Sequence, residues 1–137
     1  MRRKNTVRRR GSAAVEAALV LPLLIGLFVA SIEFSRANTV RNSVENAAYE
    51  GARRSILPGC TVAQVEDSVQ DALNAVNVSG FAVVVTPDPI DETTEEVTVT
   101  VTARLDENAY TVPQFFSGRE VASTCTLRRE SALSLIE

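Results

Sequence analysis

Few residues in this chain of 137 could take part in chemistry. They are two cysteines, a group of acids between positions 88 and 96, and one glutamate, Glu16, inside an otherwise apolar stretch. The chain has no histidine, which excludes an imidazole general base, histidine-ligated zinc and Ser/His or Cys/His nucleophile pairs. The sequence also lacks a phosphate-binding loop and a metal-ligand motif. An enzyme is therefore the least favoured class.

The two cysteines, Cys60 and Cys125, lie far apart in the sequence. In an oxidising compartment such a pair suits a structural disulfide better than a metal site or a redox pair. We predict a Cys60–Cys125 bridge, which would contribute roughly 4 kcal/mol to stability in the loop-entropy model. Two unpaired, buried thiols are the alternative.

The acids between the predicted strands could in principle hold a calcium ion. Their spacing fits no EF-hand loop, so we expect a solvated acidic loop and predict no cofactor, no metal and no small-molecule substrate. The acids are Asp88, Asp91, Glu92, Glu95 and Glu96.

Glu16 stands near the start of a segment long enough to cross a membrane. Residues 17–32 carry no charge, and residues 12–32 carry only that of Glu16, close to the ~20 residues that a crossing helix needs. We predict a single crossing that includes Ala17, Pro22, Gly26 and Ile32. A carboxylate at the edge of a crossing costs free energy, so Glu16 calls for a functional explanation.

Charge is distributed unevenly along the chain. Six of the 14 basic residues fall within the first ten positions, whereas residues 33–137 hold eight basic and 16 acidic residues. Basic residues beside a crossing helix keep that side in the cytoplasm, so we predict a cytoplasmic amino terminus and an acidic domain outside. The basic arm adjoins an apolar segment and has no interleaved aromatic residues, so nucleic acid is not an expected partner.

Periodic patterns predict the remaining elements. The helix should continue to Ile56, with Pro58 and Gly59 as stop signals. Its apolar positions recur at spacings of three and four, with Arg36, Arg41, Glu45, Glu50 and Arg54 at the other positions. A second helix is predicted over 61–76, and strands over 81–85, 97–105 and 119–129.

The predicted fold class is therefore α+β. A long membrane-spanning amino-terminal helix precedes a small extracytoplasmic domain with an antiparallel sheet. The predicted divisions are a basic cytoplasmic leader over residues 1–11, a crossing and projecting helix over 12–56, and the α+β domain over 57–137.

Gly11, Ser12 and Glu16 have the spacing of a known processing signal. The basic arm, the glycine and an acid at the fifth position after it resemble a type IV prepilin leader, in which prepilin peptidase cuts after the glycine. The wider sequence, "VEAALVLPLL", "IEFSRA" and "NAAYEGARR", resembles the TadE-like family of the tight-adherence (Flp) pilus system. The resemblance covers roughly residues 12–55.

This resemblance implies a function in pilus assembly at the bacterial inner membrane. The implied partners are membrane lipid, prepilin peptidase, other pilus or pseudopilin subunits and the inner-membrane assembly platform. Major pilins of this class tend to have tyrosine directly after the acid, whereas Ala17 stands here, which favours a pseudopilin-like component.

An ordinary secreted or singly anchored binding domain is the alternative. In that case Val29, Ala30 and Ser31 would form a signal-peptidase site and the mature chain would begin at Ile32. The first residue of the mature chain separates the two hypotheses, because cleavage by prepilin peptidase would make it Ser12.

Overall fold

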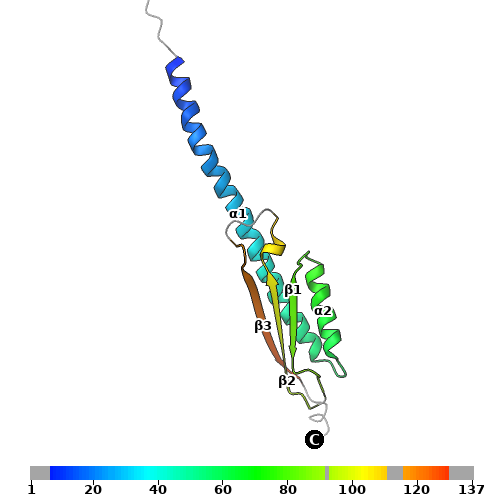
Figure 1. The fold of residues 1–137 in the computed structure, drawn as a ribbon. Helices are drawn as coiled ribbons and strands as arrows, with labels where there is room; N and C mark the ends of the chain where they lie inside the picture. The colour runs from blue at the N-terminus through cyan, green and yellow to red at the C-terminus, as the bar shows by residue number, and fades with distance from the viewer. Residues whose placement is uncertain (1–6, 92, 111–115, 130–137) are drawn as a thin grey trace, which may run out of the picture.

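The computed structural model describes residues 7–91, 93–110 and 116–129. A long helix extends from a small domain in which a three-stranded sheet packs against two helices (Figure 1). The elements are α1 (Val7–Ser55), α2 (Val62–Asn74), β1 (Phe81–Thr86), β2 (Glu96–Arg104), the short 3-10 helix η1 (Asp106–Asn108) and β3 (Glu120–Arg128). The predicted α+β class is confirmed.

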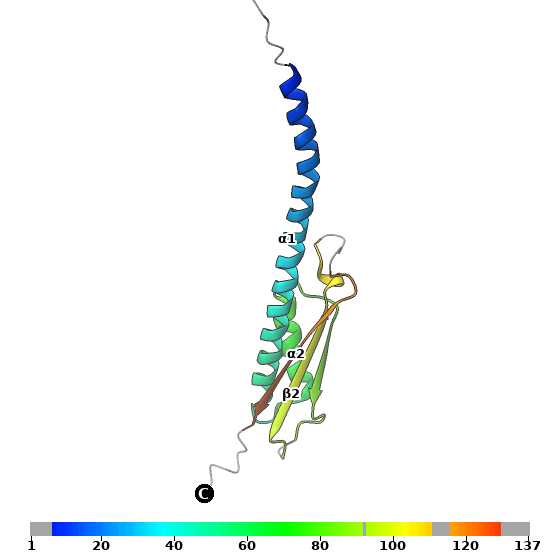
Figure 2. The same cartoon turned by 90° about the vertical axis from the view of Figure 1, so that its left-hand side faces the viewer.

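Helix α1 has two halves with different surroundings. Its 49 residues give a rod of about 73 Å, and its side chains from residue 11 to residue 32 are exposed or half-buried. From Glu33 to Ser55 one face of the same helix is buried against the domain (Figure 2). The helix continues through Pro22 and reaches the predicted end within one residue.

The helix begins earlier than predicted. We expected it to start at Ser12, after a separate leader, but α1 already starts at Val7. Gly11 lies in open space and nothing there interrupts the backbone hydrogen bonding. The valine and arginines before it are compatible with a helix, so the helix extends into the basic arm.

The end of α1 leads directly into α2. Gly59 adopts a positive φ of 73°, which turns the chain after Pro58. Thr61 then caps α2 in a reciprocal box, in which its hydroxyl accepts from the Gln64 N–H and the Gln64 side chain accepts from the Thr61 N–H. The apolar face of α2 buries Val65, Val69 and Leu73, as the periodicity predicted.

The sheet is antiparallel with the order β1-β2-β3. Strand β2 alternates between buried and half-exposed residues, because one face packs on the helices and the other is open. On the buried side α1 contacts β2 and β3, while α2 contacts β1. The predicted strands are confirmed, with boundaries within one residue.

The open face of the sheet carries a row of threonines. The Thr98 and Thr126 hydroxyls are 2.8 Å apart, and those of Thr100 and Thr124 are 3.0 Å apart. These residues are directly opposite each other in the β2–β3 register, so each pair links the two strands through its side chains as well as its backbone.

Small residues allow α1 to approach the rest of the domain closely. A methyl group added at Gly51 would lie 2.5 Å from Val69 Cγ2 and 3.3 Å from Val99 Cγ1. Gly51 is therefore the point at which α1, α2 and β2 meet. The same stripe of α1 contributes these buried residues to the core: Val40, Val44, Ala47, Ala48 and Ala52.

We predict that Gly51→Val destabilises the domain by about 1–3 kcal/mol, because the added methyl groups overpack this contact. Hydrogen exchange of the β2 amides, measured on the full chain in mild detergent, should accelerate accordingly. Gly26→Val is the matched control, since the structure places no atom within 4 Å of a Cβ at Gly26. Equal protection of β2 in both variants would contradict the close-approach interpretation.

Candidate functional site

The predicted processing residues lie on the exposed amino-terminal part of α1. Gly11, Ser12 and Glu16 are all exposed. Ser12 and Glu16 are four residues apart and therefore lie on the same face, one turn from each other. Within the part of the chain that the structure describes, Glu16 makes no hydrogen bond or ion pair, so its carboxylate is available to another molecule.

The following turns of α1 expose an apolar surface on every side. Ala17, Pro22 and Gly26 are exposed, and Ile32 is half-buried. The large exposed side chains include Leu19, Leu23 and Phe28. Contiguous apolar surface of this extent marks contact with lipid or with another protein. The helix is also long and apolar enough to cross a membrane, and its most apolar window is not buried by the domain.

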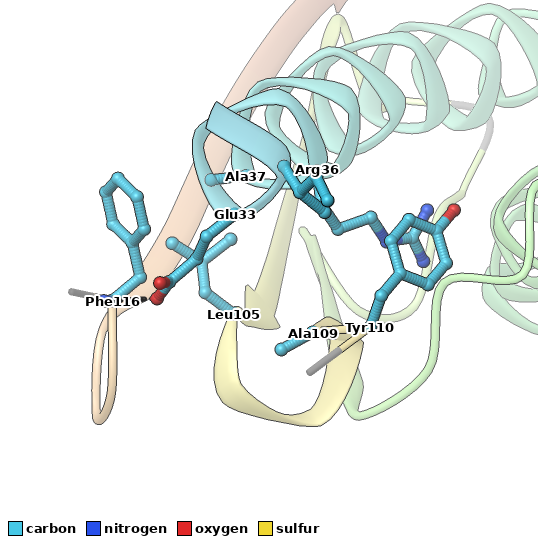
Figure 3. Close-up of a pocket in the computed structure, with 8 residues that line it drawn as sticks. Glu33, Arg36, Ala37, Leu105, Ala109, Tyr110 and Phe116 are labelled. Atoms are coloured by element: carbon cyan, nitrogen blue, oxygen red, sulfur yellow. Dashed lines mark hydrogen bonds between the residues drawn. The ribbon is translucent and has the colours of Figure 1, made fainter. Parts of the chain in front are cut away.

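Two charged residues are buried where α1 leaves this apolar half. Glu33 and Arg36 are only 6% and 8% exposed, although they follow directly on the apolar run. We call residues 32–37 the helix exit. Ile32, Glu33, Arg36 and Ala37 line a small pocket there together with residues after β2, namely Leu105, Ala109, Tyr110 and Phe116 (Figure 3).

Arg36 ties the helix exit to two loops of the domain. Its Nε donates to the carbonyl oxygen of Asn108 at 2.8 Å, and its NH2 group donates to the carbonyl oxygen of Asn77 at 2.7 Å. The Tyr110 ring lies over the guanidinium, 4.8 Å from centroid to Cζ. A planar cation with several donors can hold both carbonyls at once, which an ammonium cannot do with the same geometry.

Asn108 extends this connection. Its side-chain amide donates to the carbonyls of Ser79 and Arg104, both at 2.7 Å, and its Oδ1 accepts from the Ser79 N–H at 2.9 Å. The buried Asn108 side chain therefore joins the loop before β1 to the end of β2, while its own carbonyl binds Arg36. Helix, loop and sheet meet at one buried polar network.

Glu33 holds the segment that leads into β3. Its Oε1 accepts from the Phe116 N–H at 3.0 Å. Glu33 and Arg36 therefore reach different parts of the chain after β2, and Phe116 and Tyr110 lie on either side of the pair (Figure 3).

The sequence prediction missed this arrangement. Arg36 was placed among the polar positions of the helix, but the structure buries it, because its partners come from loops about 40 and 70 residues further along the chain. The signal that could have identified the pair is its position. An acid and a base three residues apart directly after a crossing helix are costly unless they find partners.

The predicted disulfide is not formed in this structure. Cys60 and Cys125 are free thiols, the first buried and the second half-buried. Cys60 lies in the turn after α1 and its thiol donates to the Thr61 carbonyl at 3.6 Å, whereas Cys125 lies opposite Val99 on β3. Both belong to the apolar core or pack against it, so they act here as small apolar side chains.

The acidic loop is organised by its own hydrogen bonds. Asp91 Oδ1 accepts from the Thr93 hydroxyl at 2.7 Å, the Thr93 N–H at 2.9 Å and the Thr94 hydroxyl at 3.0 Å. These bonds, first that of the Thr93 hydroxyl, lower the pKa of the Asp91 carboxyl. Glu92 lies outside the described residues, among which no three acidic, histidine or cysteine side chains gather in a way that could hold a metal ion.

Comparison with known proteins identifies the amino-terminal segment. Residues 11–53 match the sequence profile of a protein family whose description is TadE-like protein. This segment is TadE-like. The match confirms the resemblance for this segment, which carries the long apolar helix. No match was found among curated proteins or among solved structures.

The TadE-like segment coincides with one structural unit. It covers α1 from Gly11 to two residues before its end, and so contains the apolar surface, the helix exit and the stripe that packs at Gly51. The match ends before α2 and the sheet. The family pattern therefore describes the helix together with the residues by which it holds the domain.

We predict that Arg36→Lys destabilises the domain by about 1.5–3 kcal/mol, because lysine cannot replace both charge-assisted hydrogen bonds. Thermal unfolding of the full chain in detergent should show a clearly lower midpoint than the parent. Arg41→Lys, an exposed position on the same helix, is the control. A midpoint unchanged by Arg36→Lys would mean that the loops do not depend on the guanidinium.

Proposed function

We propose that the protein is a membrane-anchored, pseudopilin-like structural or assembly component of a tight-adherence pilus or a related secretion machinery. The observation that carries this proposal is the TadE-like match on a helix whose first half is exposed and apolar and bears Glu16. The single crossing would place α1 in the bacterial inner membrane, with its amino terminus in the cytoplasm and the sheet domain outside.

The charge distribution supports this orientation. The basic residues cluster before the apolar half, whereas the packed domain is acidic. Basic residues that flank a crossing stay on the cytoplasmic side, so the domain would be translocated. In that position it can contact other pilus or pseudopilin subunits without leaving the membrane.

The surroundings of Gly11 support processing by prepilin peptidase. Gly11 has nothing within 4 Å of a Cβ position, so its value to the protein does not come from packing within the described fold. A protease that must bind the chain on both sides of the cut gives a reason for the smallest residue there. Cleavage would leave Ser12 as the new amino terminus, with Glu16 one turn away.

Glu16 would then pair with a neighbouring subunit. A protonated amino terminus and a carboxylate can offset each other's desolvation in a poorly hydrated setting, and an unpartnered carboxylate there is unfavourable. The exposed position of Glu16 is consistent with a partner on another molecule, such as a pilus subunit or the inner-membrane assembly platform.

The alternative is a secreted or singly anchored binding domain with an ordinary signal peptide. Cleavage before Ile32 would leave the domain with the buried part of α1, since Glu33 is the first buried residue among those whose burial the structure describes. The TadE-like match weighs against this reading because it runs across the cut, over residues 11–53.

We predict that a reporter active only in the cytoplasm is silent when fused after Glu137, because the acidic domain lies outside. The same reporter fused to the basic arm at Met1 should be active. Activity of the carboxy-terminal fusion at the level of the amino-terminal one would reverse the proposed topology.

We predict that Gly11→Leu blocks processing in a host that contains the matching peptidase. Mass spectrometry of the extracted protein should show a mature chain beginning at Ser12 for the parent and an uncut chain for the variant. Gly26→Leu is a matched control, because both glycines lie on α1 in open space. A parent that keeps residues 1–11 beside an active peptidase would overturn the processing half of the proposal.

In the same host, Glu16→Gln should insert normally and lose most of its co-purifying pilus partners. Glu45→Gln, an exposed glutamate on the outer half of α1, serves as the control for loss of charge. Equal partner recovery from both variants would show that the Glu16 carboxylate does not act in assembly.

A further inference from the structure

An exposed aromatic side chain lies beside α1 at the helix exit. Tyr110 is 74% exposed, yet one face of its ring covers the Arg36 guanidinium. It also borders a shallow groove with Ser31, Ile32 and Ser35. Tyr110 is thus fixed against the helix while most of its surface points away from the protein.

The height of Tyr110 along α1 can be estimated from the helix rise. If residues 12–32 fill the hydrocarbon core, Arg36 stands about 6 Å beyond its edge, at ~1.5 Å per residue. The headgroup layer on each side of a bilayer is about 5–8 Å deep. Tyr110, stacked on Arg36, therefore lies at the level of the lipid headgroups.

Neighbouring residues present further aromatic surface at this level. Phe34 is 66% exposed on α1. Phe116, half-buried, is fixed through its N–H to Glu33 on the other side of the helix exit (Figure 3). Tyrosine concentrates at the membrane interface, because one end of its ring is apolar and its hydroxyl accepts hydration, and the two phenylalanines add apolar surface beside it.

We propose that Tyr110, Phe34 and Phe116 form a membrane-proximal rim that contacts the lipid headgroup layer, so that the domain rests on the bilayer as well as being anchored in it. This inference rests on the proposed membrane crossing. The rim is continuous with the apolar half of α1 and begins where that half ends.

The rim also explains why the buried charges at the helix exit are bonded to loop backbone. In the headgroup layer, water competes less effectively for a carboxylate or a guanidinium than in bulk solution, and unpartnered charges are more costly. Glu33 and Arg36 bond to the Phe116 N–H and to the Asn108 and Asn77 carbonyls instead. The charges hold the rim against α1, and the rim covers the charges.

The absence of tryptophan makes the proposal directly measurable. A single tryptophan replaces Tyr110 in the full chain, which is reconstituted in phosphatidylcholine–phosphatidylglycerol vesicles. Part of the lipid carries bromine atoms, placed either near the headgroup end of the acyl chains or near their methyl end. We expect Tyr110→Trp emission to shift to shorter wavelength in vesicles and to be quenched more strongly by the shallow bromines than by the deep ones.

Two control positions bracket this level. Leu23→Trp, 64% exposed near the middle of the apolar half, should be quenched most by the deep bromines. Tyr49→Trp, 54% exposed on the half of α1 that packs on the domain, should be quenched neither by the shallow nor by the deep bromines. Phe34→Trp is a second rim reporter, should Tyr110→Trp fail to retain the hydrogen-exchange protection of β2.

The outcomes separate this inference from the proposed function. If Leu23→Trp is quenched and both rim reporters, like Tyr49→Trp, are not, the rim does not touch lipid, although the proposed membrane crossing is supported. If Leu23→Trp is not quenched, the proposed membrane crossing is wrong, and the proposed rim is wrong as well because it depends on the crossing. Shallow quenching of a rim reporter, with deep quenching of Leu23→Trp, supports both.

Discussion

The contact at Gly51 is the one on which the small domain depends. A three-stranded sheet with one open face cannot enclose a core, and a single 13-residue helix such as α2 does not cover its other face. Helix α1 supplies the missing layer, because its stripe of small residues lets the backbone approach Val69 and Val99. The long apolar helix and the domain therefore share one core, and the half of α1 from Glu33 to Ser55 is as much part of the domain as any strand.

The second constraint is electrostatic and acts where α1 changes surroundings. Glu33 and Arg36 are buried within one turn of an apolar surface, so their charges need partners in the protein. The partners are backbone groups from three parts of the chain, namely the Asn77 and Asn108 carbonyls for Arg36 and the Phe116 N–H for Glu33. Packing at Gly51 fixes the far end of the domain on the helix, and this polar network fixes the near end.

Much of the fold could be predicted from the sequence because its patterns are regular. Alternation in "VTVTVTARL" predicted β2 and its buried face, and the spacing of Val65, Val69 and Leu73 predicted the buried face of α2. The TadE-like segment was recognised from local sequence as well. Each of these signals is local, because it lies within a single helix or strand.

The rest depended on contacts between distant parts of the chain. Burial of Arg36 depends on Asn77 and Asn108; its position directly after the apolar run distinguishes it from exposed Arg41, but the sequence does not show which groups it bonds to. The disulfide prediction relied on compartment and cysteine number, and it stays a prediction: in the structure Cys60 is a free thiol in the core and Cys125 is a half-buried free thiol packed against it. The early start of α1 was missed because a glycine was taken as a boundary, although nothing around Gly11 requires one.

The continuity of α1 has a mechanical consequence. No linker separates the apolar half from the buried half, since Glu33 follows Ile32 within the same helix. Each residue of a helix turns the chain by about 100° and advances it by about 1.5 Å, so the direction in which Glu16 points sets the direction in which the threonine face of the sheet points. Because no non-helical linker lies between the amino-terminal end of α1 and the domain, a rotation of that end about the helix axis turns the domain with it.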